Sequence, residues 1–166
     1  MTDATASFLT GTTGLSIALT FALWLTLSRP RPAVENLGRI RRAAMAGVVL
    51  QAAHFTEESL TGFHQQFPAI LGLAAWSPGL FTAFNLAWLA GWVMSIAALR
   101  RWPKTATFPL WFLGLAAVVN GLAHPLLSAA TADYFPGTWS SLFLAIAGVY
   151  LLRELAAATR ATAATR

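Results

Sequence analysis

The 166-residue chain is 57% hydrophobic and only 10% charged, whereas a soluble domain carries about 25% charged residues, so it has too few charges to cover a surface facing water. The absence of cysteine excludes disulfide bonds, thiolate metal sites and a thiol nucleophile. The formal net charge of +5 does not indicate a nucleic-acid partner, because the basic residues are confined to particular loops.

Five apolar stretches are long enough to cross a membrane as helices, because a span needs about 20 residues. In chain order they are residues 8–28, 43–61, 80–99, 108–130 and 138–152, and the fifth reaches full length if its helix continues through residues 155–158. Residues 67–78 are interrupted by two prolines and a glycine, so we expect an interfacial or re-entrant segment there. We therefore predict an all-α polytopic bundle of five transmembrane helices, with residues 1–160 as one domain and residues 161–166 as a short cytoplasmic tail.

The basic residues alternate between loops. They lie between the first and second spans, between the third and fourth, and after the fifth: Arg29, Arg31, Arg39, Arg41, Arg42, Arg100, Arg101, Lys104, Arg153, Arg160 and Arg166. Cytoplasmic loops of membrane proteins are enriched in Lys and Arg. This pattern predicts an outside N-terminus and a cytoplasmic C-terminus in a bacterial-type inner membrane or its equivalent, with membrane lipids as neighbours of the basic loops.

The second span holds three ionisable residues, His54, Glu57 and Glu58, within five positions. Each costs roughly 2.5–3.5 kcal/mol at membrane depth, and such residues normally face the interior of the bundle. Because positions three and four apart share a helical face, His54 can meet either glutamate. Gln51, three residues before His54, extends the same polar face.

The third and fourth spans add polar residues at a similar depth. Asn120 and His124 are four residues apart in the fourth span, Pro125 follows and is expected to kink the helix, and Asn85 lies in the third span. At a rise of ~1.5 Å per residue, all of them fall in the outer half of the membrane together with the His-Glu-Glu residues of the second span. We therefore predict one polar site toward the outer face, provided that the second and fourth spans are neighbours.

Three short motifs resemble a known family. The run of residues 54–58, His-Phe-Thr-Glu-Glu, the later His124, and the run of residues 134–137, Tyr-Phe-Pro-Gly, resemble the HXXEE-motif integral membrane proteins. The resemblance covers roughly the second to the fifth span. It implies a site that contains His54, Glu57, Glu58, His124, Tyr134, Pro136 and Gly137. It implies no reaction, because the biochemical function of that family is unassigned.

Two histidines and two glutamates on facing helices are typical ligands for a divalent metal, with zinc favoured over nonheme iron. We predict His54, Glu57, Glu58 and His124 as metal ligands, and Glu57 or Glu58 as a general base when it is not coordinated. His64, beyond Gly62, is either a further ligand or a solvated side chain.

Other polar and aromatic residues are assigned supporting roles. Asn120 is expected to orient a ligand or to donate to a developing oxyanion, and Tyr134 to act as a lid or a proton donor unless it is an interfacial anchor. Asn85, Trp88 and Trp92 are candidates for lining a hydrophobic substrate cavity, although packing is the favoured explanation for the two tryptophans.

These residues favour a metal-dependent hydrolase that acts on a lipid or another hydrophobic small molecule, with oxidation at a nonheme iron ranked second. A metal-free acid–base isomerase or cyclase is an alternative, because neighbouring carboxyl groups in an apolar site hold a proton strongly. A proton- or ion-coupled transporter, to which a homo-oligomer would contribute, and a polar network that only fixes helix packing are the remaining alternatives.

Overall fold

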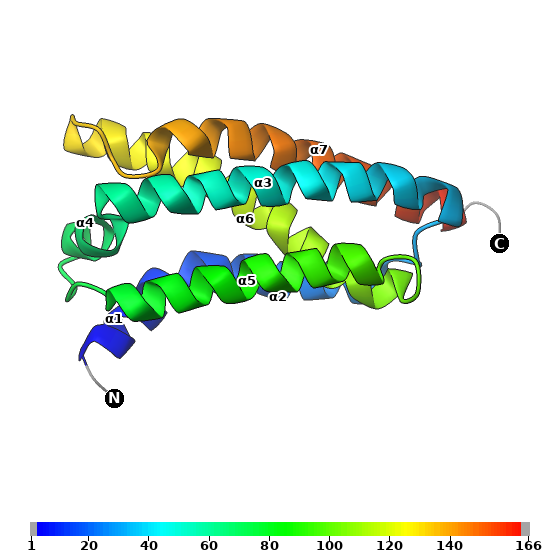
Figure 1. The fold of residues 1–166 in the computed structure, drawn as a ribbon, viewed down its shortest axis with the longest axis horizontal. Coiled ribbons are helices and arrows are strands. Elements are labelled where there is room, and N and C mark those ends of the chain that lie inside the picture. Colours follow the sequence, from blue (N-terminus) through cyan, green and yellow to red (C-terminus); the bar gives the residue numbers. More distant parts are fainter. Residues whose placement is uncertain (1–2, 164–166) are drawn as a thin grey trace.

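The computed structural model describes residues 3–163, and this part of the chain is an all-helical bundle without strands (Figure 1). Its elements in chain order are α1 (Asp3–Gly11), α2 (Thr13–Ser28), the 3-10 helix η1 (Val34–Asn36), α3 (Leu37–Thr61), α4 (Phe63–Ile70), α5 (Pro78–Ala98), α6 (Pro103–Thr131) and α7 (Thr138–Ala163). α7 thus extends into the predicted tail, of which residues 164–166 lie outside the described residues.

Three of these helices, α5, α6 and α7 as far as Arg160, are long and apolar enough to cross a membrane. The bent pair α1 and α2, counted as one broken span, raises the number to four. α3 is long enough but does not meet the same criteria of apolarity and charge. Arginines lie in its first turns, and His54, Glu57 and Glu58 lie in its last turns. The described residues therefore indicate a membrane protein, whereas the predicted five spans are not confirmed.

The first apolar stretch is broken rather than continuous, since α1 and α2 meet at an angle of 52°. The Thr12 hydroxyl at the break donates to the carbonyl oxygen of Phe8 at 2.9 Å, and such side-chain bonds to the backbone often bend helices. Gly11 has no side chain where the Trp76 ring packs, and a Cβ there would lie 2.3 Å from that ring. The bend therefore accommodates a tryptophan from a distant part of the chain.

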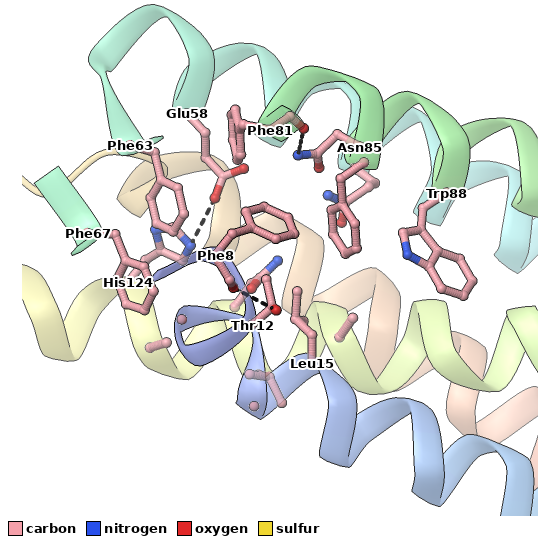
Figure 2. Close-up of a pocket in the computed structure, with 18 of the residues that line it drawn as sticks. Phe8, Thr12, Leu15, Glu58, Phe63, Phe67, Phe81, Asn85, Trp88 and His124 are labelled. Carbon is pink, nitrogen blue, oxygen red and sulfur yellow. Dashed lines mark hydrogen bonds and ion pairs between the residues drawn. The ribbon is translucent and has the colours of Figure 1, made fainter. Parts of the chain in front are cut away.

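The segment between α3 and α5 closes one end of the bundle. Gly62, in the left-handed conformation with φ of 81°, ends α3 and redirects the chain into α4. The Ser7 hydroxyl of α1 donates to the Ala74 carbonyl oxygen at 2.6 Å, which ties this segment to α1. The resulting aromatic cap, in which Phe8 and Phe63 are visible in Figure 2, contains Phe8, Phe63, Trp76, Phe81 and Phe135.

At the opposite end of the bundle, the basic segments contact one another. Lys104 donates to the backbone oxygens of Leu27 and Arg29, at 3.3 and 3.0 Å. Arg39 pairs with Glu154 of α7 at 3.3 Å. α1 begins at the capped end and α7 ends at this basic end (Figure 1), so the helix ends that carry arginine and lysine gather on one side of the molecule.

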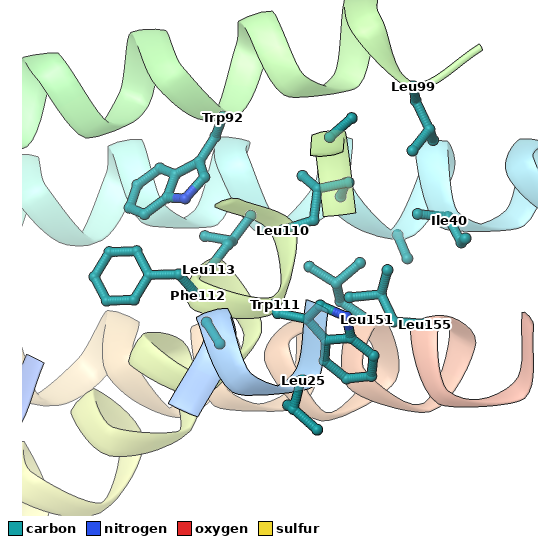
Figure 3. Packing of buried hydrophobic residues seen from close by; sticks show 14 of the residues in the cluster. Leu25, Ile40, Trp92, Leu99, Leu110, Trp111, Phe112, Leu113, Leu151 and Leu155 are labelled. Carbon is teal, nitrogen blue, oxygen red and sulfur yellow. The ribbon is translucent and has the colours of Figure 1, made fainter. Parts of the chain in front are cut away.

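The apolar core lies toward the basic end and joins α2, α3, α5, α6 and α7 (Figure 3). Its fully buried members include Ile40, Leu99, Leu110, Leu113, Leu151 and Leu155. Because lipid is as apolar as leucine, packing rather than exclusion of water stabilises helix pairs in a membrane. α6 and α7 accordingly approach closely at small residues: Gly114, Gly121 and Gly148.

Candidate metal centre

Three ligand-type side chains converge near the capped end of the bundle. His54 and Glu58, one turn apart on α3, face His124 of α6. Oε1 of Glu58 lies 3.5 Å from Nε2 of His54 and 3.5 Å from Nε2 of His124. One ligand atom from each residue lies within 4.8 Å of the other two, and all three side chains are buried, so this group can hold a metal ion.

The spacing of the three atoms matches the geometry of a small metal ion. Two ligand atoms that each lie about 2.1 Å from a tetrahedral zinc are about 3.4 Å apart. Both measured separations between histidine and glutamate are 3.5 Å. Such a distance is too long for a good N–H···O hydrogen bond, which has its mode near 2.9–3.0 Å. Oε1 of Glu58 is therefore spaced from each imidazole nitrogen like a neighbouring ligand rather than like a hydrogen-bonded partner.

The second ring nitrogen of each histidine is held by the segment that starts α7. Nδ1 of His124 lies 2.6 Å from the carbonyl oxygen of Pro136. A carbonyl only accepts, so Nδ1 carries the hydrogen and Nε2 of the neutral ring presents a lone pair to Glu58. Nδ1 of His54 lies 2.9 Å from the hydroxyl of Ser140. Contacts of this kind fix the orientation of metal-binding imidazoles.

Nε2 of His54, the ring nitrogen that faces Glu58, has no hydrogen-bond partner, although the side chain is completely buried. Buried polar atoms in folded proteins almost always have a partner. Here the nearest groups are the Glu58 oxygen and the imidazole of His124, whose ring centroid lies 4.7 Å from that of His54. A neutral His54 that donates to Ser140, a neutral His124 and a carboxylate would direct three lone pairs at one point, and a cation between them would satisfy all three.

Gly137 fits between the two histidines and admits no side chain. Its φ is 87°, in the left-handed region that favours glycine. A Cβ at this position would lie 2.7 Å from the ring of His124 and 2.8 Å from that of His54. Both the backbone conformation and the closeness of the imidazoles therefore require glycine here.

Glu57 does not join the group, contrary to its expected role as a ligand. Its carboxylate accepts hydrogen bonds from the backbone N–H groups of Trp139 at 3.2 Å and Ser140 at 2.8 Å, in the first turn of α7. It also accepts from the hydroxyl of Tyr134 at 2.6 Å. A carboxylate at a helix N-terminus satisfies free N–H groups and interacts favourably with the helix dipole. Glu57 thus holds α7, and through Ser140 and Pro136 it helps to place both imidazoles.

Tyr134 contacts Glu57 rather than the three ligand-type residues. Partial burial raises the pKa of the Tyr134 phenol, and the hydrogen bond to Glu57 raises the pKa further, so the phenol stays protonated and donates. Its side chain remains 39% exposed at the capped end. His64 is likewise outside the group and packs its ring against Phe81.

The remaining predicted residues line a cavity of about 240 Å³ that Glu58 and His124 close at one end (Figure 2). Asn85, Trp88 and Trp92 of α5 and Asn120 of α6 all belong to its wall. Most of the wall is aromatic or aliphatic, and it includes the cap residues Phe8, Phe63, Trp76 and Phe81. The polar residues that helical rise predicts at one level of the bundle thus lie around a single cavity.

Two features of the site are not predicted by the sequence analysis, Ser140 and the aromatic cap. The position of Ser140, three residues after a glycine in the first turn of a span, is nevertheless a detectable signal. The cap aromatics were also missed, because their grouping depends on the fold of α4 against α1.

No family model, no curated protein and no solved structure matches the chain. The resemblance to the HXXEE-motif proteins therefore rests on the three short motifs alone.

Proposed function

We propose that the protein is an integral membrane metalloenzyme that binds one divalent metal ion at His54, Glu58 and His124 and hydrolyses a lipid or another hydrophobic small molecule. The observation that carries this proposal is the convergence of three buried ligand atoms, one of which, Nε2 of His54, has no other partner. Three protein ligands leave a coordination position open, which is typical of catalytic rather than structural zinc sites.

Zinc ranks before iron in this proposal. Two histidines and one carboxylate also form the ligand set of nonheme iron oxygenases. Hydrolysis needs only water as a second substrate, whereas oxidation needs an additional oxidant. When bound, a zinc ion supplies an activated water and polarises the bond to be cleaved.

Two residues of the cavity wall, Glu58 and Asn120, have further chemical roles in this proposal. Both contacts of Glu58 with the imidazoles use Oε1, so its second carboxylate oxygen is the acceptor for the proton of the attacking water. For an ester substrate, the water oxygen bonds to the acyl carbon, the bond to the alcohol oxygen breaks, and that oxygen leaves with the proton that Glu58 took from the water. Asn120, on the same cavity wall, is positioned to donate a hydrogen bond to the acyl oxygen.

Five spans with an outside N-terminus and a cytoplasmic C-terminus are part of the proposal. α3 has 25 residues and is therefore about 37 Å long, enough to cross a ~30 Å hydrocarbon core. It packs against the apolar helices α5, α6 and α7, which supports its crossing the membrane beside them. The contacts among the basic segments at one end support a cytoplasmic location for that end and an outer location for the metal centre.

The same convergence of acceptors supports a second candidate, metal-free acid–base catalysis. A proton shared between Glu58 and the two imidazoles would also satisfy the facing lone pairs. Such a site could protonate an apolar substrate at one carbon and remove a proton from another, which is the chemistry of an isomerase. The presence or absence of a metal separates the two candidates.

Elemental analysis of the protein, purified without added chelator, tests the proposal. We expect about one zinc per chain in the wild type and less than a tenth of that in His54→Ala and His124→Ala. His64→Ala is the matched control, because His64 lies nearby but outside the group, and it should retain the metal. A wild-type protein that is folded and metal-free, and that does not take up added Zn²⁺, would contradict the metalloenzyme and favour acid–base chemistry.

A further inference from the structure

Buried polar atoms without a hydrogen bond concentrate around the cavity. Among the described residues, five such side-chain atoms occur: Oε1 of Gln51, Nε2 of His54, and Nε1 of Trp76, Trp92 and Trp111. Gln51, Trp76 and Trp92 line the cavity, and His54 belongs to the metal group. Polar atoms inside a membrane protein normally find partners within the fold. Their accumulation here indicates that a polar ligand completes the site.

Gln51 is the amide among these residues, and it lies on the same face of α3 as the ligands. It precedes His54 by three residues and Glu58 by seven, which corresponds to about 4.5 and 10.5 Å along the helix axis. Its side chain is only 5% exposed and lines the cavity. A buried amide can accept from or donate to an uncharged hydroxyl or amide group. Gln51 therefore offers a hydrogen-bonding site at a defined distance from the reacting centre.

Two further amides line the same cavity from other helices, Asn85 of α5 and Asn120 of α6. The Asn85 amide nitrogen uses one N–H to donate to the Phe81 carbonyl oxygen at 3.0 Å, so its oxygen and its second N–H remain for a ligand. Beyond this belt of amides the wall is aromatic, with Trp88 and Phe112 4.4 Å apart between ring centroids. The cavity thus has a reacting end, an amide belt and an apolar end.

The ionisable residues of the cavity wall restrict the charge of the ligand that can bind. Glu58 and His124 are its ionisable residues, and no Lys or Arg occurs among the described residues that line it. A phosphate group is normally bound by such cations, so a phosphate-bearing headgroup does not fit. The volume of about 240 Å³ is below the range typical of drug-sized ligands, which favours one hydrocarbon chain over two.

We propose that Gln51, supported by Asn85 and Asn120, binds an uncharged hydroxyl or amide group of a single-chain amphiphile. The reacting bond of this substrate lies beside His54, Glu58 and His124, and its hydrocarbon chain lies along Trp88, Trp92 and Phe112. This inference rests on the proposed function, since the metal centre defines the reacting end, and it names the substrate class of that site.

Binding of matched probes tests the inference without depending on turnover. The probes are methyl 3-hydroxydodecanoate, whose hydroxyl group lies between its ester and its alkyl chain as the order of the cavity requires, and dodecanoyl lysophosphatidylcholine, which has no hydroxyl group between its ester and its chain and carries a phosphate. Binding is measured by native mass spectrometry on metal-depleted protein, so that hydrolysis does not interfere. We expect wild-type protein to bind the hydroxy ester at least tenfold more tightly than the phosphate-bearing probe. Equal affinity for the two probes, or preference for the phosphate, would overturn the inference whatever the variants do.

Gln51→Met removes the amide but keeps an unbranched side chain of similar length, and Gln65→Met is the matched control at an exposed position of α4. Losing one hydrogen bond to a neutral partner should weaken binding of the hydroxy ester about fivefold to tenfold in Gln51→Met, with no change in Gln65→Met. Unchanged binding in a folded Gln51→Met protein would overturn the subsite. Metal content separates the two proposals: selective probe binding by a protein that never takes up metal would support the subsite and contradict the metalloenzyme.

Discussion

Adjacent glutamates have different tasks in this protein. Glu58 faces two imidazoles in the interior, whereas Glu57 binds the first turn of α7 and the Tyr134 hydroxyl. Sequence indicated that His54 would pair with one of them, because both lie within a turn of it. The two glutamates point about 100° apart on a helix, so the positions of α6 and α7 around α3 decide which one enters the site.

Substitution by glutamine should separate these tasks. Glu58→Gln replaces a charged ligand by a weak one and should lose most of the bound metal. Glu57→Gln keeps an oxygen that can accept from Ser140 but loses the interaction of its charge with the helix dipole, so it should retain the metal and unfold with a free energy lower by about 1–2 kcal/mol. Metal content and thermal unfolding in detergent measure both effects, and equal metal loss in the two variants would contradict the assignment.

Gly137 provides a sharper test, because a single methyl group should act on both imidazoles. Gly137→Ala should abolish metal binding, since the new Cβ would lie within 2.8 Å of His54 and His124. Gly72→Ala is the control, because Gly72 also has a left-handed φ, 67°, but open space around it. Both variants incur about 1–2 kcal/mol of backbone strain, and only Gly137→Ala should lose metal. Retention of full metal content in Gly137→Ala would show that the imidazoles are placed differently.

At the scale of the helices, the approach of α6 to α7 positions His124. Gly121 lies one turn before His124, and a Cβ there would lie 2.2 Å from the Cβ of Ala145 in α7. Gly121→Ala should therefore push the helices apart and lower the free energy of unfolding by about 1–3 kcal/mol. Gly91→Ala on α5, where nothing lies within 4 Å, should be neutral or stabilising, because alanine favours helix more than glycine. Equal unfolding temperatures for both variants would rule out this tight packing.

The helices themselves were largely predictable, and their irregularities were not. The apolar stretches gave α5 and α6 to within a few residues, because long apolar runs determine such helices. The break between α1 and α2 was missed, since it depends on Trp76 packing against Gly11, 65 positions away in the chain. α7 continues for eleven residues beyond the predicted stretch 138–152, up to Ala163, and so includes and passes the optional extension through residues 155–158. Apolarity alone does not fix this end, because Arg153 and Glu154 interrupt the apolar run.

At the scale of the whole molecule, the orientation in the membrane is open to direct labelling, because the chain contains no cysteine. Ser28→Cys at the basic end and Gln65→Cys in the capped end are single, exposed labelling sites. The proposed topology predicts that a membrane-impermeant maleimide labels Gln65→Cys in intact cells and Ser28→Cys only after the membrane is permeabilised. The reverse pattern would place the metal centre toward the cytoplasm.

The depth of the polar residues followed from sequence, whereas their convergence required the packed bundle. Helical rise places His54, Glu58 and His124 at one level, but two helices, α4 and α5, lie between α3 and α6 in the chain, and the contact of α3 with α6 is a property of the fold. X-ray absorption at the metal edge of the purified protein tests that convergence most directly. We predict a spectrum with two imidazole nitrogens and at least one oxygen at about 2.0–2.2 Å from the metal. A folded protein without a metal edge, or a metal without imidazole ligands, would contradict the proposed centre.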